Sequence, residues 1–343
     1  MAETAASTGD SGADTPTEAD ADPGTAPDRA ALVLVALILV AAVANLNLAV
    51  ANVALPDIGQ HFDAGQTGLN LVAVGFSLGL AASVLWLGAL GDRYGRKQMV
   101  LLGLALSVPA SIVAAWAPSL AVLTIARIGG GLAAGMAFPT TLALITALWS
   151  GAKRTRAIAL WSAIGGGFSA LGPLASGALL EVAWWGSVFL ITLPLAALAL
   201  VLAAVFLPSH VNESSGSVDN LGGILSVFFV ALVVLSINFF PLPGAKPVAG
   251  IMGAAGLLFG ALFMWRQRRA TNPLYDLSVE SRTLLWVAGL AGVIGVGSRR
   301  GAWFSGQQSR QDVLGCRPGE AGAAVRPAVV ARVLGARRGG RRV

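Results

Sequence analysis

Arg127 is the only ionisable residue in the apolar run of residues 120–149. A guanidinium inside a bilayer costs at least ~2.5 kcal/mol on insertion scales, so this arginine is expected to face a polar cavity or a bonding partner. The alternative is that its long side chain extends to the nearer membrane surface, because Arg127 follows Ser119 by only a few residues. The first alternative makes Arg127 a functional residue, and the second makes it a residue of the membrane boundary.

A second group of charged residues lies in the segment 88–97, which reads G-A-L-G-D-R-Y-G-R-K. Uncharged runs flank it on both sides, and each is long enough to supply the roughly 20 apolar residues of a membrane helix. The segment is predicted to form a close-packed, hydrogen-bonded turn. An ordinary basic loop would explain its three cations but not the spacing of its carboxylate and glycines. The candidate residues are Gly88, Asp92, Arg93, Gly95, Arg96 and Lys97.

The overall composition is that of an all-α polytopic membrane protein, with 55% hydrophobic residues, 12% charged residues and a mean hydropathy of +0.74. The net charge of +6 is distributed unevenly: −6 over residues 1–29, +4 over 30–297 and +8 over 298–343. The first segment has little to bury, so we expect a disordered acidic tail. It lacks the features of a signal peptide, which predicts that the first helix is retained. Most of the basic excess lies in the C-terminal segment, for which a nucleic-acid- or lipid-binding tail is the alternative. No basic amphipathic period is visible in this segment, so no nucleic-acid partner is expected.

Uncharged runs predict the membrane spans. They are residues 30–55, 69–90, 99–116, 120–149, 157–180, 186–207, 221–240, 248–265 and 284–297. Alternate loops between these spans contain ten Lys and Arg residues, whereas the opposite loops contain only Lys246. Because cytoplasmic loops retain basic residues, we expect a multi-pass protein of the cytoplasmic membrane with its N-terminus inside.

The segment 88–97 matches G-x-L-x-D-R-x-G-R-K, the signature of the major facilitator superfamily between its second and third membrane helices. The chain therefore resembles this superfamily, and the resemblance implies a major facilitator fold. In that fold, residues 30–207 form a complete N-terminal six-helix bundle, followed by a cytoplasmic loop at 208–220. Residues 221–265 are a two-helix insert, and residues 266–283 are a basic cytoplasmic loop. The resemblance also implies that the six motif residues form a gate at the cytoplasmic side.

Residues 284–343 are expected to contain the start of a C-terminal bundle. After residue 297, ten arginines fall within 46 residues, so we expect this bundle to be truncated and incomplete. Alternating access needs two bundles that move around a shared site. An inactive or regulatory membrane fragment is therefore the alternative to an active transporter.

The fourth predicted helix carries a further motif. Arg127 is followed by Gly131, Ala134 and Pro139, which resembles the superfamily motif R-x-x-Q-G-x-G-A-A with its later proline. Gly130 replaces the glutamine of that motif, and this removes one possible hydrogen-bond partner. In relatives the arginine lines the central path and acts in proton coupling, so the resemblance implies these roles for Arg127.

In the fifth predicted helix, Gly172, Pro173 and Gly177 resemble the antiporter motif G-P-x-x-G-G, with Ser176 in place of the first of its final glycines. Small residues also serve as a general packing face, because they let helix backbones approach closely. The motif separates exporters from importers within the superfamily. The resemblance therefore implies export.

The first predicted helix resembles the L-D-x-T-I-V-N-V-A-L-P-x-I segment of the fourteen-helix drug:proton antiporter branch. Asn52 and Pro56 match that segment, but Asn47 replaces its membrane aspartate. An acid in the membrane can carry a proton or attract a cationic drug, and an asparagine can do neither. Proton coupling would then depend on Asp92, on acids at the outer rim, or on further parts of the chain.

Together these resemblances imply a secondary active transporter that exports small amphipathic compounds or drugs in exchange for protons. Its partners would be membrane lipid, the exported compound and protons. No cofactor, metal site or catalytic residue is expected. The chain has no G-x-x-x-x-G-K-[ST] nucleotide loop, and no cluster of His, Asp and Glu at membrane depth supports a membrane enzyme.

Overall fold

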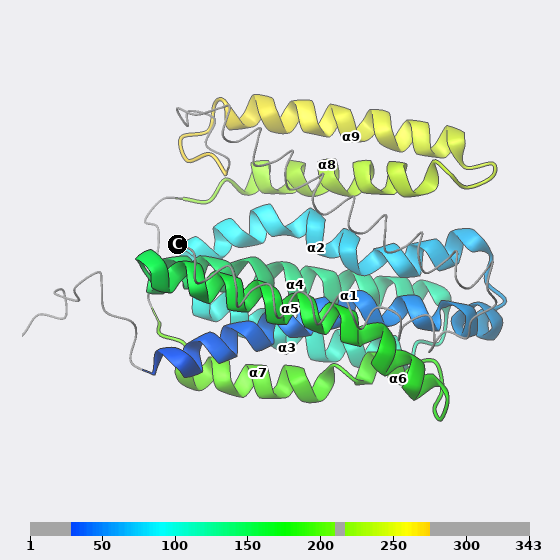
Figure 1. Cartoon of the computed structure of the whole chain (residues 1–343). Helices are drawn as coiled ribbons and strands as arrows, with labels where there is room; N and C mark the ends of the chain where they lie inside the picture. Colours follow the sequence, from blue (N-terminus) through cyan, green and yellow to red (C-terminus); the bar gives the residue numbers. More distant parts are fainter. Residues whose placement is uncertain (1–28, 210–216, 275–343) are drawn as a thin grey trace, which may run out of the picture.

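The computed structural model describes residues 29–209 and 217–274, and every regular element in these ranges is a helix. The helices are α1 (Ala30–Phe62), α2 (Gln66–Tyr94), α3 (Arg96–Ala115), α4 (Leu120–Leu148), α5 (Gly151–Leu180), α6 (Ser187–Leu190), α7 (Leu193–Phe206), α8 (Asn220–Phe239) and α9 (Lys246–Gln267). Eight spans are long and apolar enough to cross a membrane, one of them formed by α6 and α7 together (Figure 1). The first eight predicted spans are therefore confirmed as helical. The predicted span at 284–297, the acidic tail and the arginine-rich segment lie outside the described residues.

The sixth predicted span is not one continuous helix. The helical hydrogen-bond pattern is interrupted at Ile191 and Thr192, between α6 and α7 and just before Pro194, although both residues keep right-handed helical backbone angles. Proline has no N–H to donate to the preceding turn and restricts the residue before it, so it interrupts a helix but is accommodated in the first turn of a new one.

The segment 88–97 is a helix junction rather than the predicted turn. Helix α2 continues to Tyr94 and α3 begins at Arg96, so Gly95 alone separates them. Gly95 has a φ of 110°, which residues with a Cβ rarely adopt. The predicted turn is wrong because an uncharged run marks only the part of a helix inside the membrane, and both helices continue into the charged region.

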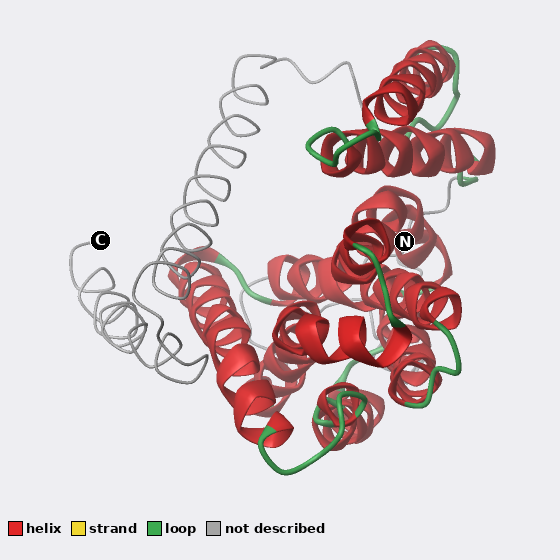
Figure 2. Cartoon of the chain, turned by 90° about the vertical axis from the view of Figure 1, so that its right-hand side faces the viewer, coloured by secondary structure: helices red, strands yellow, loops and turns green. Residues whose placement is uncertain are grey.

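Helix α1 lies at the centre of the described helices. In the most apolar 18-residue stretch of α1, 72% of the residues are buried, whereas the corresponding share is 17% for each of α5, α8 and α9. Two clusters of buried apolar side chains, one along each half of α1, join it to α3, α4, α6 and α7. Figure 2, which looks along the helices, shows the more exposed α8 and α9 as a pair at one edge of this group.

The α8–α9 pair contacts the other helices through α2. The Trp86 indole N–H donates to Asn220 Oδ1 at 3.1 Å near the start of α8, and Asn70 Nδ2 donates to the Asn238 carbonyl at 3.0 Å near its end. These two bonds hold α8 alongside α2 at both of its ends (Figure 1).

Asp219 joins the start of α8 to the end of α9. Its carboxylate accepts the backbone N–H of Gly222 at 3.1 Å, which caps α8, and also accepts bonds from Arg266 and Gln267 at 3.2 Å. The Asp219 side chain is only 4% exposed. A buried carboxylate with charged and backbone donors of this kind stabilises the pair more than a surface ion pair would.

We expect Asp219→Ala to lower the thermal midpoint of the purified protein. The substitution removes the cap of α8 and the hydrogen bonds that Arg266 and Gln267 donate to this carboxylate, which together cost about 1–3 kcal/mol. The measurement is the loss of tryptophan fluorescence on heating in detergent. Asp57→Ala removes an exposed acid of α1 and serves as the control. Equal midpoints for the two variants would show that the Asp219 bonds do not stabilise the pair.

Candidate functional site

The side chain of Arg127 points into the protein. The Ser119 hydroxyl caps α4 by accepting the Val122 N–H at 3.3 Å, and this fixes where the helix begins and which face carries Arg127. Arg127 is 2% exposed, and its Nη1 donates to the backbone carbonyl of Asn47 in α1 at 2.9 Å. The alternative in which Arg127 extends to the membrane boundary is therefore wrong.

Two aromatic rings flank the guanidinium. Its carbon lies 5.0 Å from the ring centre of Phe76 in α2 and 5.7 Å from that of Phe189 in α6. A cation above an aromatic face is stabilised by about 2 kcal/mol or more where water is excluded. Neither ring was predicted as a site residue, because both lie in uncharged runs of membrane length.

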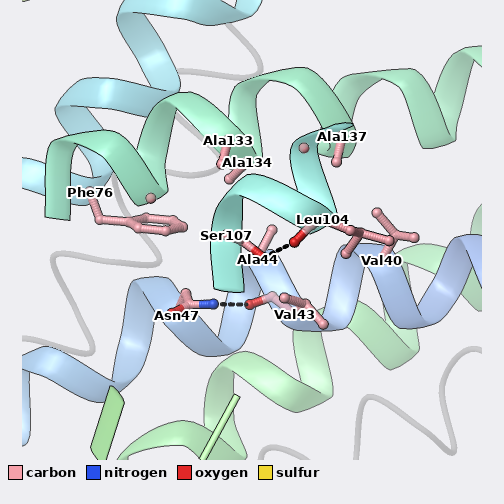
Figure 3. Close-up of a pocket in the computed structure, with 12 residues that line it drawn as sticks. Val40, Val43, Ala44, Asn47, Phe76, Leu104, Ser107, Ala133, Ala134 and Ala137 are labelled. Carbon is pink, nitrogen blue, oxygen red and sulfur yellow. Dashed lines mark hydrogen bonds between the residues drawn. The ribbon is translucent and has the colours of Figure 1, made fainter. Parts of the chain in front are cut away.

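Asn47 is also buried and lies beside Arg127. Its Nδ2 donates to the Val43 carbonyl at 3.2 Å (Figure 3). Its Oδ1 lies 3.4 Å from the hydroxyl of Thr192. The break between α6 and α7 places Thr192 there, with its hydroxyl also 3.0 Å from the Phe189 carbonyl. The structure therefore brings together four segments at Arg127, from α1, α2, α4 and the α6–α7 break.

Two small cavities adjoin this group and share Asn47, Phe76 and Gly130 as lining residues. Figure 3 shows the cavity that Arg127 does not line. The other is also lined by Arg127, Phe189 and Ser111, and it has room for about one water molecule. Gly130 lies at the position where the fourth-helix motif of the superfamily has a glutamine. Because glycine has no side chain, the cavity beside Arg127 stays open at this position. A drug-sized ligand needs about 300 Å³ or more, so these cavities are too small for one.

The residues of the α2–α3 junction form a second, separate group. Arg96 Nε donates to Asp92 Oδ1 at 2.7 Å, and the two side chains form an ion pair. Asp92 lies at the C-terminal end of α2 and Arg96 at the N-terminal end of α3, where each charge is disfavoured by its own helix dipole. The ion pair offsets both unfavourable positions. Gly95 supplies the positive φ between them, whereas a Cβ on Gly88 would meet no neighbouring atom within 4 Å.

The remaining candidate residues are not at the Arg127 group. Asn52 and Pro56 are exposed on α1, and Arg93 is exposed at the end of α2. Lys97 is half-buried in the first turn of α3. Of the first-helix candidates, only Asn47 contacts Arg127.

Sequence comparison identifies the family. The profile of the Major Facilitator Superfamily matches residues 37–311, which is most of the chain. The chain belongs to this superfamily. Its members are transporters and not enzymes, and the chain is a multi-pass membrane protein.

The relatives within the superfamily include drug efflux pumps. The chain is 37% identical to the multidrug resistance protein Stp of Mycobacterium tuberculosis over 236 residues, which are 68% of this chain and 44% of Stp. It is 34% identical to the multidrug efflux pump LfrA of Mycolicibacterium smegmatis over 311 residues, 90% of this chain and 62% of LfrA. It is 31% identical to the methyl viologen resistance protein SmvA of Salmonella typhimurium, over 88% of this chain and 61% of SmvA. The chain thus matches 44–62% of the length of these three relatives.

The residues that resemble the antiporter motif lie in α5, which packs on α1. Gly172 is buried against α1, and a Cβ at this position would lie 2.7 Å from the Cβ of Ala49. Gly177 has open space around it. Pro173 lies between them within the helix, and the buried Ser176 hydroxyl has no hydrogen-bond partner among the described residues. The two glycines of the motif therefore have different surroundings, although the sequence pattern treats them alike.

We expect Gly172→Val to lower the thermal midpoint, because the added side chain overlaps α1 and overpacking costs about 1–3 kcal/mol. Gly177→Val is the matched control and should leave the midpoint nearly unchanged. Both are measured by tryptophan fluorescence on heating in detergent. If both variants lose the same stability, the motif does not act through the α1–α5 contact.

Proposed function

We propose that the protein is a secondary active exporter of small amphipathic compounds that is driven by a proton gradient. The observation that carries the proposal is the buried Arg127, which a structural role alone does not explain. Ionisable residues at membrane depth are costly, and they are usually kept where they line a substrate or ion path. Stp and LfrA, named as multidrug resistance and efflux proteins, support the same class of substrate.

We further propose that the N-terminus lies in the cytoplasm. The helices alternate in direction, so the end that carries Gly95 also carries ten of the twelve lysines and arginines of the described residues. Lys246 lies at the opposite end, and Arg127 is buried. By the positive-inside rule, the end of the helices that carries Gly95 then faces the cytoplasm. The protein would accordingly lie in the cytoplasmic membrane.

The proposed mechanism is movement of two bundles around a central site. We assign residues 30–207 to the first bundle and residues 221–265 to an inserted pair, and the second bundle would follow them in the chain. The ion pair of Asp92 and Arg96 would hold the cytoplasmic side closed in one state and be exchanged for contacts with the second bundle in the other. The exposed acids Asp57 and Glu181 are the candidate proton carriers at the outer side.

The test is export of ethidium from a bacterial host that lacks its own efflux pumps. Cells with the wild-type chain should retain less dye than cells with an empty vector, and a proton uncoupler should remove the difference. Retention equal to that of the empty vector, with the protein present in the membrane, would overturn the proposed function.

In this assay Asp92→Asn should raise dye retention to the level of the empty vector, because the neutral amide cannot form the ion pair with Arg96. The pair is half-exposed, with 46% of the Asp92 side chain accessible, so its loss should change stability by only about 0–1 kcal/mol. Tyr94→Phe changes an exposed neighbour on the same helix and is the control for a non-specific effect. Full export by the Asp92→Asn variant would show that the junction is not a gate.

A further inference from the structure

The guanidinium of Arg127 has unused hydrogen-bonding capacity. Nη1 is bonded to the Asn47 carbonyl, but Nε and Nη2 are buried and have no partner among the described residues. An arginine presents five N–H donors in a fixed plane and remains charged in proteins. A buried donor without an acceptor destabilises the fold, and a charged one does so more strongly. The observed contacts of Arg127 therefore leave its Nε and Nη2 without the acceptor that a buried, charged donor requires.

The charge of Arg127 is also unbalanced within the described residues. The two ion pairs that the structure shows there are Asp92–Arg96 and Asp219–Arg266, and neither involves Arg127. The polar side chains that line the cavity with Arg127 are those of Asn47 and Ser111, and both are neutral. Phe76 and Phe189 stabilise the cation through their faces, but a ring face does not replace an anionic acceptor for the N–H groups of Nε and Nη2.

The place for an acceptor is the cavity that Arg127 itself lines. Its other walls include Asn47, the hydroxyl-bearing Ser111 and the bare backbone of Gly130, and it is otherwise apolar. The space is that of about one water molecule, which suits one small acceptor. A larger compound would place only its anionic head group against this cavity, with its body outside. An apolar cavity of low dielectric strengthens the attraction between an anion and the guanidinium.

We propose that this cavity is an anion subsite, which takes either a halide-sized ion or the carboxylate of an exported compound. The anion would accept hydrogen bonds from Nε and Nη2 of Arg127 and balance its charge. In the second case, which rests on the proposed export function, the substrates of this chain would include amphipathic carboxylates. The neutral side chain of Asn47 is what allows an anion to bind here. An acid at this position would place its own negative charge in the cavity and would exclude a second anion.

The test is the thermal midpoint of the full-length purified protein in detergent, in a buffer whose main anion is gluconate. Chloride is titrated in one arm, and benzoate is titrated in a second arm with the neutral benzamide as its isosteric control. At about ten times its dissociation constant a bound anion should raise the midpoint by a few degrees. A rise with chloride alone identifies a free halide site, and a rise with benzoate but not benzamide identifies a carboxylate site. Either result supports the subsite.

Three variants connect the effect to the cavity. Arg127→Met should abolish the anion dependence, and Asn47→Asp should abolish it while keeping the arginine, because the new carboxylate competes for the same donors. Arg156→Gln removes an exposed arginine of α5 and should keep the full effect. No anion effect on the wild type, an equal effect of benzamide, or an undiminished effect in Asn47→Asp would each overturn the subsite. Because the readout is binding, it is independent of whether the chain exports ethidium.

Discussion

Replacing Gly131 with valine should prevent the described helices from packing as they do and should remove folded protein from the membrane. A Cβ at this position would overlap the carbonyl oxygen of Phe76 and lie 2.9 Å from the Leu80 nitrogen and 3.0 Å from the Gly79 Cα. All three atoms belong to the backbone of α2, so no side chain can move aside. Overpacking costs about 1–3 kcal/mol where side chains can adjust, and we expect a larger cost here.

The same run of glycines supplies a matched control. A Cβ on Gly129, two residues earlier in α4, would meet no neighbouring atom within 4 Å. Gly129→Val should therefore give normal amounts of protein, a single gel-filtration peak in detergent and an almost unchanged thermal midpoint. If Gly131→Val behaves like Gly129→Val, the close contact of α2 and α4 is not needed for folding.

This contact also positions the site. Where α2 and α4 meet through Gly79 and Gly131, Phe76 is brought against Arg127, one turn away on each helix. Small residues permit such contacts in membranes, where apolar side chains gain nothing by leaving lipid. The glycines of α4 thus connect a local sequence pattern to the geometry around the arginine.

The positions of the helices were predictable from the sequence, because apolar runs of membrane length are a strong signal. Their ends were not, since charged residues are tolerated in the first and last turns outside the apolar layer. The junction at Gly95 is the clearest example. The capping role of Asp219 had a sequence signal, an aspartate directly before a helical run, but its bond to Arg266 lies 47 residues away in the chain.

The environment of Arg127 could be predicted only in part. The motif indicated a functional arginine, but α4 is apolar around its whole circumference, so no periodicity shows which face is buried. Of the two flanking rings, Phe76 of α2 has no distinctive sequence context. Phe189 of α6 lies between Trp185 and Pro194 in a pattern that resembles the fourteen-helix branch, but this pattern does not show that its ring meets Arg127. Their roles depend on how the helices pack, which a single sequence does not reveal.

Replacing Arg127 with methionine should abolish ethidium export and at the same time raise the thermal midpoint. Methionine fills a similar space and introduces no buried charge, and the Asn47 carbonyl that Arg127 contacts lies within the continuous helix α1. Replacing a buried charge by an apolar residue is often neutral or stabilising by about 1–4 kcal/mol, and no carboxylate partner among the described residues would be left unpaired. A stabilising substitution that removes function is typical of a residue kept for function at a cost in stability.

The thermal midpoints of the wild type and of Arg127→Met are compared in gluconate buffer, so that a small bound anion does not stabilise the wild type. Ethidium export by both is measured in the efflux-deficient host. Arg127→Lys keeps the charge but not the planar donors, so it should retain part of the export activity with no gain in stability. A fall in the midpoint of Arg127→Met together with lost export would mean that Arg127 mainly holds α1 and α4 together. Retained export with a raised midpoint would mean that the arginine is dispensable and that transport takes another path through the bundle.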